Sequence, residues 1–110
     1  MKIVTQEKDG VVCLKISGRL DAESAPEAET TVKGILKDGK HRLIFDLSEM
    51  EYISSAGLRI ILMTVKELQV KKGKVVLSAL TPYVKEIFDV SNFSSIIPIT
   101  ETVEAGFQQI

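Results

Sequence analysis

The chain has 110 residues, of which 45% are hydrophobic and 26% charged, and its formal net charge is −1. This balance is typical of one globular domain and excludes a disordered chain. Charges of both signs are spread along the sequence, so no basic stripe indicates direct nucleic-acid binding and no polybasic cluster indicates membrane binding.

The first third of the chain predicts a hairpin, a loop and a helix. Strand-like segments at 2–8 and 11–17 flank Asp9-Gly10, a pair that accepts the positive φ angles of a tight β-turn. The "GRLD" loop follows at 18–21. "SAPE" then predicts a capping box, in which the Ser24 hydroxyl accepts from the Glu27 N–H and opens a helix that stops at Gly39.

The remainder predicts alternating strands and helices. The expected elements are a buried strand "RLIFDLS" at 42–48, a long amphipathic helix at about 55–72, a buried strand "KVVLSAL" at 74–80, a helix at 81–90 with Thr81 as cap, a short edge strand "SIIPI" at 95–99, and a last helix capped by Thr100. The order β-β-α-β-α-β-α-β-α predicts an α/β fold with a mixed sheet and helices packed mainly on one side.

Two adjacent serines, Ser54 and Ser55, stand where a strand gives way to the long helix. One of them is expected to be the N-cap, because serine is favoured there. A cap explains neither the second serine nor Gly57, since glycine in a helix costs ~1 kcal/mol relative to alanine. Gly57 therefore predicts a close approach to the backbone or tight packing of the helix on the sheet.

Serine catalysis is disfavoured by the pattern around these residues. With Ser55 as nucleophile, a G-x-S-x-G elbow would need glycine where Ile53 stands. The single histidine, His41, precedes the 42–48 strand and is expected about 20 Å from Ser55, too far to act as its base. The single cysteine, Cys13, and the absence of a phosphate loop or metal-ligand spacing predict no cofactor and no metal.

Chemical modification of a serine is the third interpretation of the pair. A phosphate adds about 1.5 to 2 negative charges at neutral pH. The free N–H groups and the dipole of a helix N-terminus tolerate such a charge, so the surface would change sign while the fold stayed intact. The sequence also has no segment near the ~18 apolar residues of a membrane span and no signal-peptide core, so we expect a cytoplasmic protein without membrane contact.

The segment "FDLSEMEYISSAGLRIILMTVKEL" at 45–68 resembles the signature of the STAS domain, and specifically the bacterial anti-sigma factor antagonists. "ISGRLDAESAPEAE" at 16–29 resembles the second strand, loop and first helix of that family, and residues 72–110 resemble its last third. The resemblance therefore covers essentially the whole chain, as a single STAS domain over residues 1–110.

The resemblance implies a regulatory function without catalytic activity. An unphosphorylated antagonist binds an anti-sigma factor that is also a serine kinase and frees the sigma factor; the kinase then phosphorylates the antagonist, and a PP2C-type phosphatase resets it. By motif position the acceptor is Ser55. The expected partner-facing residues are Asp21, Ser54, Ser55, Ala56, Gly57 and Arg59.

One departure from the family pattern leaves alternatives open. Many members have Asp immediately before the acceptor, whereas this chain has Ser54. Ser54 is therefore the alternative acceptor. The alternative function is an unphosphorylated STAS scaffold subunit of a sensing or transport complex, and no phosphate loop supports a nucleotide-binding role.

Overall fold

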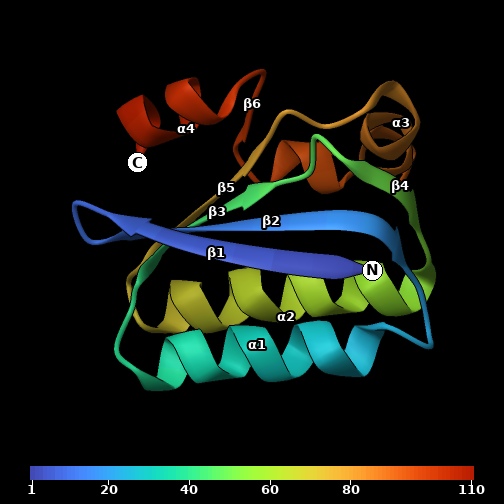
Figure 1. The fold of residues 1–110 in the computed structure, drawn as a ribbon. Coiled ribbons are helices and arrows are strands. Elements are labelled where there is room, and N and C mark those ends of the chain that lie inside the picture. The colour runs from blue at the N-terminus through green and yellow to red at the C-terminus, as the bar shows by residue number, and fades with distance from the viewer.

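A mixed β-sheet forms the centre of the molecule in the computed structural model, which describes residues 1–110 (Figure 1). The elements follow in the order β1 (Lys2–Lys8), β2 (Val11–Leu20), α1 (Ala25–Lys37), β3 (Arg42–Asp46), β4 (Met50–Ile53), α2 (Ser55–Val70), β5 (Lys74–Ser78), α3 (Pro82–Val90), the 3-10 helix η1 (Phe93–Ser95), β6 (Ile99–Thr100) and α4 (Val103–Gln109).

The sheet runs in the order β1-β2-β3-β5-β6, and β4 pairs with the end of β2. β1 lies antiparallel to β2, and the other pairs are parallel. The hairpin turn has φ angles of 53° at Asp9 and 78° at Gly10, as the sequence predicts. The predicted mixed α/β sheet is confirmed, with one strand, β4, that the sequence did not predict.

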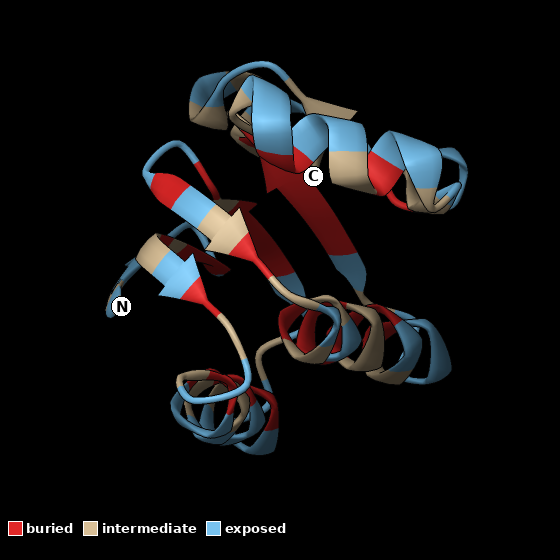
Figure 2. Cartoon of the chain, turned by 90° about the vertical axis from the view of Figure 1, so that its right-hand side faces the viewer, coloured by how far each residue is buried: buried red, intermediate tan, exposed pale blue.

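Alternate residues of the strands supply two separate cores. The larger core lies between the sheet and α1 and α2, and Val84 and Phe88 of α3 complete it. The smaller core contains Cys13, Ile44 and Val76, and α4 covers it from the other face. Buried residues line the sides of the helices that face the sheet, and exposed residues lie outside (Figure 2). α1 and α2 cover one face of the sheet, α4 covers the other, and α3 packs beside β4 (Figure 1).

Two expectations for the last third are wrong in detail. The segment 95–99 is mostly non-strand, because η1 occupies its start and Pro98 has no N–H to donate, so β6 contains only Ile99 and Thr100. Thr100 does not cap α4. Its hydroxyl lies 2.7 Å from the Ser78 hydroxyl and donates to the Thr102 carbonyl oxygen, and the cap is the Thr102 side chain, which accepts from the Ala105 N–H at 3.0 Å.

Candidate functional site

The start of α2 lies against the loop that follows β2, at the carboxyl ends of parallel strands (Figure 1). Pairing of Leu20 with Ile53 brings the two segments together, and the backbone N–H of Ser54 donates to the Leu20 carbonyl oxygen at 2.9 Å. This edge is where open α/β sheets commonly bind ligands and partners.

The two serines have different surroundings. Ser54 is the N-cap of α2, with an extended backbone, and its hydroxyl oxygen accepts from the Gly57 N–H at 3.3 Å. Ser55 is the first helical residue and is exposed, whereas Ser54 is half-buried. The capping bond thus uses the hydroxyl of Ser54 and leaves that of Ser55 uncommitted.

Gly57 allows α2 to pack directly on β2. A Cβ at this position would lie 2.7 Å from the Leu20 carbonyl oxygen and 2.9 Å from Cγ1 of Ile53, distances that real Cβ atoms do not adopt. Of the two explanations that the sequence left open, tight packing of the helix on the sheet is therefore the one that this structure supports.

Asp21 organises the loop beside the serines. Its Oδ1 accepts from the backbone N–H groups of Ser24 and Glu23, each at 3.1 Å, and these bonds, with the Ser24 bond contributing most, lower the pKa of the Asp21 carboxyl. The Ser24 hydroxyl accepts from the Asp21 N–H at 3.0 Å and donates to the Arg19 carbonyl oxygen at 2.8 Å. The predicted capping box between Ser24 and Glu27 is therefore wrong, because the loop uses that hydroxyl.

The remaining expected residues divide into surface and packing positions. Arg59 is exposed one turn along α2 from Ser55, and its charge contributes to lowering the pKa of Glu29 on α1, after the larger effect of Lys33. Ala56 is half-buried and packs against the larger core, and Gly57 is buried. Of the expected residues, Ser55 and Arg59 are therefore the exposed ones, and Asp21 is half-buried.

A cation–aromatic stack beside the serines was not predicted from the sequence. The Arg19 guanidinium lies 4.2 Å from the ring centroid of Tyr52, and its Nε lies 3.8 Å from Oδ2 of Asp21. Tyr52 stacks on Tyr83 with centroids 6.3 Å apart. Tyr52 lies in β4, the strand that the sequence did not predict, so its neighbours could not be assigned from periodicity alone.

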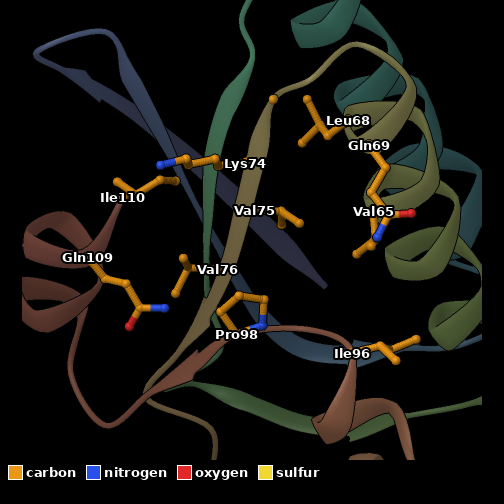
Figure 3. A pocket seen from close by; sticks show the side chains of 11 residues that line it. Val65, Leu68, Gln69, Lys74, Val75, Val76, Ile96, Pro98, Gln109 and Ile110 are labelled. Carbon is orange, nitrogen blue, oxygen red and sulfur yellow. The ribbon is translucent and has the colours of Figure 1, made fainter.

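An apolar pocket of about 350 Å³ lies elsewhere, along the edge of β5 (Figure 3). It begins at Lys74, the first residue of β5, whereas Ser55 lies past the last residues of parallel strands. Its lining contains no acid, serine, histidine or cysteine and consists of Val65, Leu68, Gln69, Gly73, Lys74, Val75, Val76, Ile96, Pro98, Gln109 and Ile110. The pocket is therefore separate from the serine site, and Lys74 has the only titratable side chain in its lining.

His41 lies just before β3, and its carbonyl oxygen accepts from the Lys74 N–H, so it belongs to the opposite end of the sheet from Ser55. No cluster of three His, Cys, Asp or Glu side chains is placed to hold a metal ion. None of the helices is both long and apolar enough to cross a membrane.

Comparison with known proteins identifies relatives over nearly the full length. Residues 2–106 match the family model described as the STAS domain. BtrV of Bordetella bronchiseptica, which is named as a candidate anti-sigma factor antagonist, is 35% identical over 106 residues, which cover 96% of this chain and 91% of BtrV.

Solved structures share the fold at lower identity. A candidate anti-sigma factor antagonist of Thermotoga maritima superposes with a TM-score of 0.95 at 23% identity, over 98% of this chain and 93% of that one. SpoIIAA from Bacillus, solved in the phosphorylated form, superposes with a TM-score of 0.78 at 16% identity, over 99% and 100% of the two chains. Its unphosphorylated form, described as an anti-sigma factor antagonist, gives 0.77 at 16% identity, over 98% and 96%. These relatives are named as regulatory antagonists rather than enzymes.

Proposed function

The chain belongs to the STAS domain family, and from that premise we propose that it is an anti-sigma factor antagonist whose binding is switched off by phosphorylation of Ser55. In the unphosphorylated state it binds an anti-sigma factor that is also a serine kinase, and the sigma factor held by that kinase is released. Both the likeness to BtrV over 96% of the chain and the exposed serine at the start of α2 support this assignment.

The observation that carries the choice of acceptor is the different use of the two hydroxyls. Ser54 accepts from the Gly57 N–H and is half-buried, so moving it into a kinase active site would cost the cap of α2. Ser55 is exposed and its hydroxyl is uncommitted. In the proposed step the Ser55 Oγ forms a bond to the γ-phosphorus of ATP, the bond to ADP breaks, and the hydroxyl proton passes to a base on the kinase.

The phosphate would alter the surface without unfolding the domain. It would stand in the first turn of α2, where the helix dipole and free N–H groups stabilise negative charge. The fold is compatible with such a change in a relative, because SpoIIAA is similar to this chain to nearly the same degree in its phosphorylated and unphosphorylated forms. A PP2C-type phosphatase would restore the binding form, and the cycle would run in the cytoplasm.

Mass spectrometry after incubation with the cognate kinase and ATP tests the assignment. The peptide that spans residues 51–59 contains both serines, and we expect one phosphate on Ser55. Ser55→Ala should accept no phosphate, and Ser54→Ala, the matched control, should still be phosphorylated. Phosphate on Ser54 in the Ser55→Ala protein would move the acceptor by one residue. No phosphate on either serine, together with a stable complex, would favour the scaffold function in a sensing or transport complex.

A further inference from the structure

Arg19, Tyr52 and Tyr83 form a continuous row of stacked side chains, here called the aromatic row. The guanidinium of Arg19 lies over the Tyr52 ring, and the Tyr52 and Tyr83 rings are 20° from parallel. The row crosses three elements, since Arg19 belongs to β2, Tyr52 to β4 and Tyr83 to α3. It therefore joins α3 to the edge of the sheet that carries Ser55.

The aromatic row is too exposed to be explained by core packing. Tyr83 has 47% of its surface exposed, and the Arg19 side chain has 62%. The attachment of α3 to the core comes instead from Val84 and Phe88, which are fully buried. Stacked tyrosines and an arginine that already share a fixed arrangement lose little side-chain freedom on binding, and these residue types are enriched among those that dominate binding energy.

The aromatic row is continuous with the serine site. Arg19 pairs with Tyr52 in the β2–β4 register, and the next pair, Leu20 with Ile53, leads directly to Asp21 and Ser54. Asp21 links Arg19 to the loop that follows β2. Its Oδ2 lies 3.8 Å from Nε of Arg19, and its Oδ1 accepts from the backbone N–H of Ser24 in that loop. The aromatic row therefore begins one residue pair before the point where Asp21 and Ser54 follow their strands.

We propose that the aromatic row is a second contact surface for the same anti-sigma factor kinase, a proposal that rests on the proposed function. An apolar side chain of the kinase packs on the exposed face of Tyr83. An acidic side chain of the kinase pairs with Arg19, whose contact with Asp21 is made through Nε and leaves the two Nη groups free to donate. The aromatic row then contributes binding energy, and phosphorylation of Ser55 ends the binding.

Titration calorimetry of the cognate kinase with variants of α3 tests the proposal. We expect Tyr83→Ala to weaken binding about tenfold or more, a loss typical of a central interface residue, and Tyr83→Phe to bind like the wild type because it keeps the ring. Val90→Ala is the matched control, since Val90 is 76% exposed at the other end of the same helix, and it should bind like the wild type. Arg19→Lys, which keeps the charge but loses the planar stack, should also weaken binding.

The outcomes separate this proposal from the function on which it rests. Circular dichroism first confirms that each variant is folded. If Tyr83→Ala and Arg19→Lys bind within twofold of the wild type while Ser55→Asp loses the kinase, the aromatic row is not a contact surface and the antagonist function stands. If Val90→Ala weakens binding as much as Tyr83→Ala, the effect is not specific to the aromatic row and the proposal is overturned. If the wild type does not bind the kinase at all, both proposals are overturned.

Discussion

The hydroxyl oxygen of Ser54 accepts a hydrogen bond from the backbone N–H of Gly57, at a distance of 3.3 Å. The donor lies three positions after the acceptor in the chain, which is the geometry of a helix N-cap. Because a cap needs a single side chain, Ser54 is engaged by the helix and the neighbouring Ser55 is not. Ser54 stabilises the helix, and the Ser55 hydroxyl takes no part in the cap.

Removing the cap should cost stability, and removing its neighbour should not. We expect Ser54→Ala to lower the free energy of unfolding by about 1 kcal/mol, the usual cost of an N-cap serine. Ser54→Asp keeps an accepting oxygen and should unfold like the wild type. Ser55→Ala is the matched control and should stay within about 0.5 kcal/mol, as surface substitutions do. Urea unfolding measures all three; equal losses for Ser54→Ala and Ser55→Ala would contradict the assignment of the cap.

Two glycines in helices should respond in opposite directions to the same substitution. Gly57→Ala should destabilise the fold by about 1–3 kcal/mol, because the new Cβ would lie 2.7 Å from the Leu20 carbonyl oxygen and force α2 off the sheet. Gly34→Ala, in the interior of α1, meets nothing within 4 Å and should add up to about 1 kcal/mol through helix propensity. The urea midpoints of the two variants test this prediction. A higher midpoint for Gly57→Ala than for the wild type would show that α2 does not pack tightly on β2.

A negative charge at Ser55 should separate binding from folding. Ser55→Asp should melt within a few degrees of the wild type, because an acid in the first turn of a helix is mildly favourable. The same carboxylate should weaken binding to the cognate anti-sigma factor about tenfold or more, since a charge desolvated without a countercharge costs several kcal/mol. Arg59, one turn away, reduces the loss to the extent that it pairs with the new acid.

Isothermal titration with Ser55→Ala as the neutral control measures this effect. Ser55→Ala should bind about as well as the wild type, because it removes the acceptor without adding charge. Equal affinities for the wild type and Ser55→Asp, with both proteins folded, would rule out a charge switch at this position.

The thiol of Cys13 should make the fold sensitive to alkaline pH. Burial, with a smaller effect of the Asp46 charge, raises the pKa of this thiol to about 11 from 9.0. The folded state therefore keeps the proton to a higher pH than the unfolded state. The contribution of Cys13 to the free energy of unfolding is complete below pH 9 and is lost as the pH rises from 9 to about 11. Urea unfolding at pH 8 and pH 10.5 should show a smaller alkaline loss for Cys13→Ala than for the wild type.

A thiol reagent gives an independent check on Cys13. In the folded protein at pH 8, Cys13 is 8% exposed and protonated, so labelling should be slow and should become rapid in denaturant. Rapid labelling of the folded protein would show that the small core under α4 opens easily.

The parts of the fold that the sequence predicts are those with a strong local signal. The hairpin follows from Asp9-Gly10, and α2 follows from a long apolar stripe that begins at a serine. β4 has only four residues, and it exists because it pairs with β2, more than thirty positions earlier in the chain. The β4 sequence MEYI is too short and irregular to show the alternation of a strand, so neither β4 nor the aromatic row built on Tyr52 could be predicted.

The errors at Ser24 and Thr100 come from contacts that the local cap pattern does not contain. The Ser24 hydroxyl accepts from the Asp21 N–H and donates to the Arg19 carbonyl oxygen, so it binds the loop before α1 and not the helix end. Thr100 belongs to β6, where its hydroxyl lies against Ser78, and the cap of α4 is Thr102, two residues later. Sequence patterns identify the candidates for a cap, and the tertiary contacts choose among them.

The contact between Gly57 and the Leu20 carbonyl oxygen makes the proposed phosphorylation site a discontinuous epitope. The residues around Ser55 have their places only because a strand from the first fifth of the chain lies against them. A synthetic peptide of residues 46–62 has the same letters but lacks that strand, and we expect it to be a poor substrate for the kinase. An unfolded or partly degraded copy of the chain would also be a poor substrate. We therefore expect the kinase to phosphorylate folded molecules in preference to unfolded ones.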